Sequence, residues 1–158
     1  MLNEFISFLV ENLADPLVIS FILGALPISE VRGAAIYAFS VNNPSLIFPA
    51  IISNIIICPL ILLFWKTLKI QKIGEFILGK SLDSKLHKFA KNYENQGILA
   101  LIVFIGLPLP ATGVYTGTLL AEILGIKRSK ILLGSIIGVF LSAAVMYFLL
   151  SNLFSLFV

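Results

Sequence analysis

Two charged residues, Glu30 and Arg32, stand inside an otherwise apolar stretch of the sequence. A charge at membrane depth costs at least about 2.5 kcal/mol, and such residues usually mark a substrate or ion site. The guanidinium of Arg32 suits the phosphate of an anionic headgroup, because its fork of donors matches the phosphate oxygens. The carboxylate of Glu30 could bind a proton or a cation. The alternative is a structural ion pair that closes a turn, and the sequence favours the binding site.

The spacing of this pair has a geometric consequence. On a continuous helix, residues two apart do not face each other, whereas in extended or broken backbone they point the same way. Pro27 interrupts the helical pattern just before the pair. We therefore expect both side chains to share one side of a broken segment, with Ser29 beside them as a further binding residue.

A second polar segment, residues 108–117, offers hydroxyl groups and open backbone groups but no charge. We expect Thr112, Tyr115 and Thr116 to contact a ligand there. A helix that begins after such a break points partial positive charge at an anion. Asn54, in the middle of another apolar run, could line the same cavity or could hydrogen-bond across helices.

Prolines and glycines recur in both polar segments, where we expect them to shape the turns. Proline removes a backbone donor and ends a helix, and glycine permits backbone that other residues avoid. The residues concerned are Pro27, Gly33, Pro108, Pro110, Gly113 and Gly117.

No catalytic or metal-binding constellation is apparent. The single histidine, His87, lies among lysines in a segment expected at the surface, and the single cysteine, Cys58, precedes a proline in an apolar run. The sequence contains no G-x-S-x-G motif, no carboxylate pair and no histidine base in its apolar part. It therefore indicates neither an enzyme nor a cofactor, and a zinc site is nearly excluded.

The composition is that of an integral membrane protein. Of the 158 residues, 59% are hydrophobic and 12% are charged, whereas soluble domains carry about 25% charged residues. The mean hydropathy is +1.06. The net charge of +3 is too small to indicate nucleic-acid binding and is better explained as a topology signal.

Two apolar runs, residues 46–65 and 131–150, are long enough to cross a membrane, which takes about 20 helical residues. Pro49 and Pro59 predict a kink in the first of them. A broken apolar run precedes each, and its halves are too short to span. The halves are 17–26 and 34–41 around a break at 27–33, and 98–107 and 114–126 around a break at 108–113.

The two breaks align with each other, since Ser29 pairs with Thr112 and Val31 with Val114. The chain therefore consists of two copies of one unit, each a broken segment followed by a full helix. Broken segments in corresponding positions of two halves indicate the binding site of a transporter. Within one membrane domain, we expect an amphipathic N-terminal helix over 1–15, repeat 1 over 16–65, a basic amphipathic connector over 66–96 and repeat 2 over 97–158.

Basic residues favour one of two topologies for these repeats. They gather in residues 66–91 and in Lys127, Arg128 and Lys130. If both broken segments crossed the membrane, the two basic clusters would lie on opposite sides, against the positive-inside rule. If each broken segment is a re-entrant hairpin, both clusters are cytoplasmic. We therefore expect inverted repeats in the cell membrane, with the two hairpin tips meeting near the midplane and a cytoplasmic connector.

Residues 26–34, LPISEVRGA, and residues 106–117, GLPLPATGVYTG, resemble the two signatures of the small multidrug export protein family. The resemblance covers nearly the whole chain and implies export of small drugs. The arrangement is more distantly similar to the DedA or VTT (SNARE-associated) membrane proteins. That similarity implies cation-coupled movement of lipids such as polyprenyl phosphates. It also implies acidic and arginine residues in the hairpins, which Glu30 and Arg32 match, whereas the second hairpin here lacks an arginine.

These observations predict an all-α polytopic membrane protein that acts as a secondary transporter. The predicted activity is either small multidrug export or the flipping of a lipid phosphate, with proton or cation coupling at the hairpin tips. The alternatives are a non-transporting membrane scaffold and a membrane-embedded lipid-modifying enzyme. Membrane lipids are expected partners. A homodimer is also expected, because four membrane elements bury little in a monomer and Gly134 and Gly138 could form a helix contact.

Overall fold

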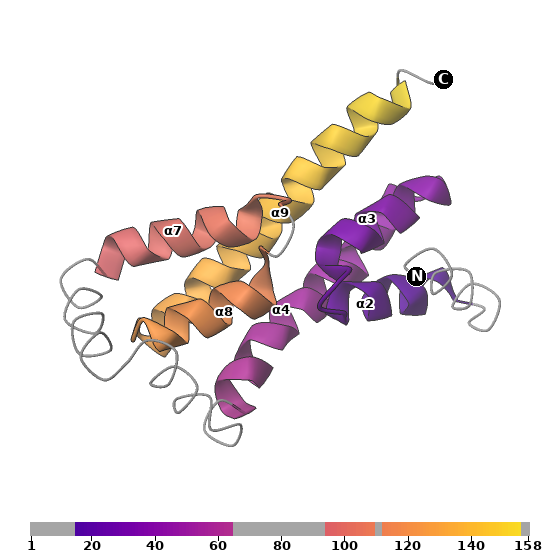
Figure 1. Ribbon diagram of the computed structural model, residues 1–158. Coiled ribbons are helices and arrows are strands. Elements are labelled where there is room, and N and C mark those ends of the chain that lie inside the picture. Colours follow the sequence, from indigo (N-terminus) through magenta and orange to yellow (C-terminus); the bar gives the residue numbers. More distant parts are fainter. Residues whose placement is uncertain (1–14, 65–93, 110–111, 156–158) are drawn as a thin grey trace. The chain divides into compact units, whose positions relative to one another are not determined.

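The computed structural model describes residues 15–64, 94–109 and 112–155 of the chain (Figure 1). Every regular element in these ranges is a helix, which confirms the all-α prediction for this part. The predicted N-terminal helix and most of the predicted connector lie outside the described residues. The elements are α2 Pro16–Ala25, α3 Glu30–Ser40, the short 3-10 helix η1 Pro44–Leu46, α4 Ile47–Phe64, α7 Glu94–Gly106, α8 Val114–Ile123 and α9 Arg128–Ser155.

Within the described ranges, two stretches of helix are long and apolar enough to cross a membrane, Pro44–Phe64 and Arg128–Ser155. They correspond to the two spanning runs expected from the sequence. Pro49 occupies the third position of α4, where the backbone nitrogen needs no hydrogen-bond partner. Of the two prolines, only Pro59 lies beyond the first turn of α4, so only Pro59 removes a hydrogen bond from the helix interior.

A pair of short helices precedes each long one. The pair α2 and α3 and the pair α7 and α8 are each packed together, and the chain reverses direction within each pair (Figure 1). None of the four approaches the length of about 20 residues that spans a bilayer. Each half of the chain thus follows the predicted order of broken segment and long helix. The inverted orientation of the halves and the re-entrant position of the hairpins stay predictions.

Contacts within the chain define two compact units that differ from the two predicted repeats. One unit holds the described residues up to Asn54 together with those from Ser142 onward. The other holds the described residues between Ile55 and Leu141. The two long helices α4 and α9 therefore each contribute to both units. The boundaries between the two units lie within α4 and α9 and not in the connector between the predicted repeats. Each long helix extends beyond the hairpin that precedes it and so also packs in the other unit.

Helix α2 approaches α4 closely in the first unit. A Cβ on Gly24 would lie 2.5 Å from the backbone of Ala50, so only glycine fits there. The hydroxyl of Ser20 donates to the carbonyl of Leu46 from a fully buried position. Such polar contacts satisfy groups that hydrocarbon surroundings would leave without a partner.

Glycines also set the packing of the second unit, where α7 contacts α8 and α9. A Cβ on Gly117 of α8 would lie 2.8 Å from the side chain of Ile105 in α7, and one on Gly138 of α9 would lie 2.7 Å from the same side chain. Gly134 faces Leu101 of α7 less closely, since a Cβ there would lie 3.1 Å from the end of that side chain. The helix contact expected of Gly134 and Gly138 is therefore made within one chain, and the homodimer stays a prediction.

Candidate functional site

The first break in the apolar sequence is shorter than its composition suggests. Helix α2 ends at Ala25, and α3 already begins at Glu30, whose backbone N–H donates to the carbonyl of Leu26 at 2.8 Å. Pro27 disfavours continuation of α2, but no later residue of the segment prevents the helix from resuming. The expected break over 27–33 is therefore corrected to residues 26–29, and Arg32 lies in the first turn of α3.

Glu30 and Arg32 do meet, although not through extended backbone. The Nη2 of Arg32 donates to Oε2 of Glu30 at 3.2 Å. Residues two apart on a regular helix do not face each other. Glu30, however, has a φ of 49°, a left-handed conformation that few residues other than glycine adopt. This backbone at the first position of α3 accounts for the contact between the two side chains.

The ion pair is largely withdrawn from the surface. The side chain of Glu30 is 9% exposed and that of Arg32 is 18% exposed. Separating two buried opposite charges is costly, because each would be left without compensation in a medium of low dielectric constant. The pair is formally neutral, so a charged ligand that binds to one partner leaves a net charge in the site. That charge must be balanced, either by a second ion such as a proton or by displacement of the other partner.

Ser29 lies beside the pair and adds a polar group. It is 3% exposed, and its hydroxyl has no hydrogen-bond partner among the described residues. A buried polar group without a partner costs about 1–3 kcal/mol, which makes a ligand or water an expected neighbour. A Cβ on Gly33, one turn along α3, would overlap this hydroxyl. Gly33 was expected to shape the turn, but it lies within α3 and makes room for Ser29.

The second break, between α7 and α8, is closed by the side chain of Thr112. Its hydroxyl lies 2.9 Å from the carbonyl oxygen of Leu107 and 2.8 Å from that of Leu109, both of which accept from it. Gly113 follows with a φ of 146°, a conformation that only glycine adopts readily. Thr112 and Gly113 therefore fix the turn together, while Pro110 lies outside the described residues.

The other residues expected from this segment lie in α8. Tyr115 and Thr116 occupy its first turn and are half-buried. Gly117 was expected to shape the turn, but it lies within α8, where it packs against α7. Helix formation resumes at Val114 because no proline follows the turn.

A buried hydroxyl that the sequence analysis did not select, Thr118, follows Gly117 in α8. It is fully buried, and its Oγ1 has no hydrogen-bond partner among the described residues. Ser135 of α9 has the same character at 1% exposure. The signal that could have identified them is a hydroxyl placed within a predominantly apolar helix.

Asn54 makes a hydrogen bond across helices, one of the two roles considered for it. Its Nδ2 donates to the carbonyl oxygen of Gly24 at 2.8 Å, from a position that is 1% exposed. The bond joins α4 to α2 at Gly24, whose lack of a side chain lets the two helices approach closely. Asn54 thus supports the helix that leads into the first break.

The described structure places the predicted site residues in two groups, and their role in binding stays a prediction. Ser29, Glu30 and Arg32 lie together at the start of α3 in the first unit. Thr112, Tyr115 and Thr116 lie at the second break in the other unit. The contact between the two tips stays a prediction. In the described ranges, no group of three or more His, Cys, Asp or Glu side chains could hold a metal ion.

Comparison with known proteins gives one family match. A family model described as "Putative small multi-drug export protein" matches residues 30–145. The match begins at Glu30, the first residue of α3, includes the second break and covers well over half of the chain. No curated protein and no solved structure matches the chain, and the distant similarity to DedA proteins stays a prediction.

Proposed function

Because the chain belongs to the family of putative small multi-drug export proteins, we propose that it is a secondary transporter that moves small amphiphilic molecules across the cell membrane. The observation that carries the proposal is the buried pair of Glu30 and Arg32 at the start of α3. Ionisable groups at membrane depth are costly and usually serve transport. The hairpin of α2 and α3 would place the pair at a tip inside the bilayer.

The charges of the pair indicate the class of substrate. While Glu30 is ionised, it neutralises Arg32. When Glu30 takes up a proton, Arg32 keeps its charge and can bind an anionic group through its fork of donors. The site is then neutral in both states, which avoids the large cost of an uncompensated buried charge. A cationic substrate at Glu30 would instead have to displace Arg32 and leave that charge buried.

This scheme links the substrate to the proton. The anion and the proton bind together and cross as a neutral pair, so the membrane potential neither drives nor opposes their movement. Outward transport is driven by the gradient of the substrate and is opposed by an acidic exterior. Ser29 directly precedes Glu30 in the chain, and its buried hydroxyl would be a further donor for the same anionic group.

The same site would also accept the phosphate of a membrane lipid, which makes a lipid flippase the second candidate. The specific observation in its favour is the combination of a guanidinium with an unpartnered buried hydroxyl, since both groups donate to phosphate oxygens. A scaffold or a lipid-modifying enzyme would not need the exchange of a proton at Glu30.

The test compares two dyes of opposite charge in vesicles that contain the purified protein. The anionic probe is 8-anilinonaphthalene-1-sulfonate, the cationic probe is ethidium, and efflux of each is followed by fluorescence. We expect transport of the anion alone, and a loss of at least about tenfold in Arg32→Gln, because the buried charge partner is removed. The conservative variant Arg32→Lys should keep part of the rate, since it keeps the charge.

The outcomes separate the alternatives. Transport of ethidium that depends on Glu30 and not on Arg32 would identify a cation exporter and refute the anion scheme. Movement of a fluorescent phospholipid without movement of either dye would identify the flippase. If the folded protein moves none of the three, the chain is not a transporter of these substrates, and the scaffold becomes the better explanation.

A further inference from the structure

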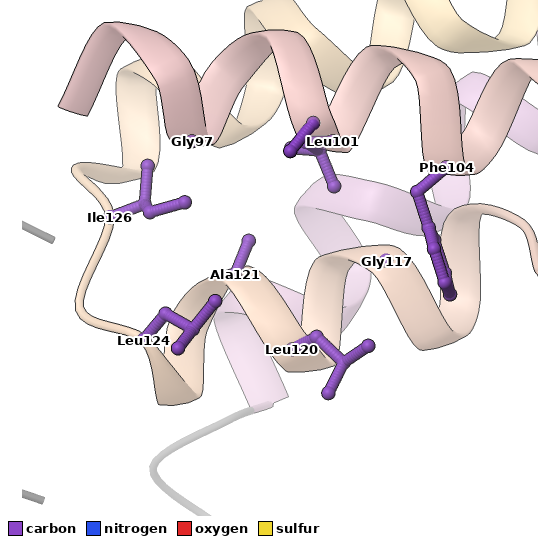
Figure 2. Close-up of a pocket in the computed structure, with 9 residues that line it drawn as sticks. Gly97, Leu101, Phe104, Gly117, Leu120, Ala121, Leu124 and Ile126 are labelled. Atoms are coloured by element: carbon purple, nitrogen blue, oxygen red, sulfur yellow. The ribbon is translucent and has the colours of Figure 1, made fainter. Parts of the chain in front are cut away.

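An apolar pocket of about 160 Å³ lies between α7 and α8, in the second unit (Figure 2). Its walls come from both helices and from the turn after α8, and all its lining residues are apolar or glycine. Ala100 of α7 and Ala121 of α8 leave the space open, and Phe104 and Leu120 bound it. The pocket is separate in the chain from Glu30 and Arg32.

The lining determines what can fill this pocket. A water molecule needs two to four polar partners to occupy a cavity, and this lining offers no polar side chain. An empty space deprives the surrounding atoms of dispersion contacts. In a membrane protein the abundant apolar material is the hydrocarbon chain of a lipid. One acyl chain, or part of it, is the occupant that matches the lining.

The charge at one end of the pocket selects among lipids. Ile126 lines that end, Lys127 follows it directly, and Arg128 and Lys130 lie in the first turn of α9. Arg128 forms an ion pair with Glu122 at 2.6 Å, so these four side chains together carry an excess of positive charge. No acidic side chain lies in the first turn of α9, although acids are favoured at the positive end of a helix. The helix dipole and the basic side chains both attract an anion.

We propose that this pocket binds one acidic phospholipid of the surrounding bilayer. One acyl chain lies between α7 and α8, and the phosphate lies at Lys127 and Lys130. Basic clusters beside pockets between membrane helices are the usual setting for acidic headgroups. The site does not depend on the proposed transport activity, because it uses neither Glu30 nor Arg32.

The experiment measures lipid binding to the purified full chain by native mass spectrometry after delipidation. Phosphatidylglycerol and phosphatidylcholine with identical acyl chains are titrated separately. We expect phosphatidylglycerol to bind about tenfold more tightly or better. The double variant Lys127→Gln/Lys130→Gln should lower its affinity to that of phosphatidylcholine, while Arg128 keeps its pairing with Glu122.

A second variant tests the pocket itself. Ala100 lines the pocket and is exposed, so Ala100→Phe should fill the space and weaken the binding of both lipids. The matched control is Ala144→Phe, the same change at an exposed alanine of α9 outside the pocket. The proposal is overturned if Ala100→Phe and Ala144→Phe bind phosphatidylglycerol equally, or if the lysine variant keeps the preference for it.

A third measurement uses the unaltered protein and so does not depend on how a variant folds. Phosphatidylglycerol with a photoactivatable group in its acyl chain is cross-linked to the protein, and the modified peptides are mapped. We expect labels within residues 97–126. Labels confined to other parts of the chain would show that the acyl chain binds elsewhere.

Discussion

At the scale of single residues, Glu30 combines chemistry with unfavourable backbone. It carries a buried carboxylate and a φ of 49°, a conformation that costs a residue other than glycine about 1–3 kcal/mol. Its neighbour Ser29 has a buried hydroxyl with no partner among the described residues. The left-handed backbone of Glu30 and the buried hydroxyl of Ser29 both lower the stability of the fold, so stability does not explain why they occur side by side. They agree with a site whose ligand or proton supplies the missing contacts.

The backbone of Glu30 gives a test by paired substitutions. Glu30→Gly and Glu30→Ala both remove the carboxylate and its ion pair with Arg32. Only glycine adopts a φ of 49° without steric cost, so Glu30→Gly should be more stable than Glu30→Ala by about 1 kcal/mol. The apparent melting temperature in detergent measures the difference. An alanine variant as stable as the glycine variant would contradict the left-handed backbone.

The contact between Ser29 and Gly33 gives a second test. Alanine in place of glycine within a helix ordinarily gains about 1 kcal/mol, but a Cβ on Gly33 would overlap the hydroxyl of Ser29. Gly33→Ala should therefore lower the melting temperature. Removing the hydroxyl in Ser29→Ala/Gly33→Ala should recover part of the loss, because the closest overlap disappears while the two Cβ atoms would still be only 3.0 Å apart. Strictly additive effects of the two substitutions would rule out the contact.

At the scale of elements, glycines determine how the short helices pack. Gly24 allows α2 to approach α4, while Gly117 and Gly138 allow α8 and α9 to approach α7. In lipid, helices associate through close packing and interhelical hydrogen bonds, since the surrounding tails are as apolar as the side chains. The hydrogen bond from Asn54 to the carbonyl of Gly24 is an interhelical bond of this kind, between α4 and α2. These contacts hold the short helices α2 and α7 against the long ones, and α8 against α7.

Two glycines of α9, Gly134 and Gly138, can be compared to test this packing. A Cβ on Gly138 would lie 2.7 Å from the Cβ of Ile105 and 3.3 Å from the backbone oxygen of Ile102, neither of which can easily move. A Cβ on Gly134 would meet only the end of the Leu101 side chain, at 3.1 Å. Gly138→Ala should therefore be clearly destabilising, and Gly134→Ala nearly neutral or slightly stabilising. Thermal unfolding in detergent measures both, and equal losses would refute the difference in packing.

At the scale of the whole molecule, the order of elements leaves two topologies to distinguish. Each half has two short helices followed by a long one. If the short pairs are re-entrant hairpins, the connector and the start of α9 lie on the same side of the membrane. If the short pairs cross the membrane, these two basic regions lie on opposite sides. The positive-inside rule favours the first arrangement.

Cysteine labelling in intact cells measures this directly. Cys58 is the single cysteine of the chain and is buried, so Cys58→Ser provides the background. On that background we expect Lys80→Cys and Lys127→Cys to be protected from a membrane-impermeant thiol reagent outside the cell. Asn43→Cys, in the turn before η1, should react with the same reagent. Reaction of only one of the two lysine positions would support crossing segments instead of hairpins.

The sequence determined much of the fold, because apolar run length and proline position act locally. The two long helices, the two broken segments and the all-helical class of the described residues follow from hydrophobicity and from the positions of the prolines. Both predicted breaks lie where the structure has them, but the first is shorter than predicted, at residues 26–29 instead of 27–33. Proline stops the helix before it, while nothing in residues 28–33 prevents a new helix from starting at Glu30.

The sequence by itself also marked Glu30 and Arg32, since charges within apolar sequence are conspicuous in any conformation. Only the tertiary structure decided how they meet, through the left-handed backbone of Glu30, and which glycines serve packing and which serve turns. It also gave Asn54 its partner, 30 residues away in the chain. The physical reason is that hydrophobicity and helix breaking depend on neighbouring residues, whereas close approach depends on which faces of distant helices meet.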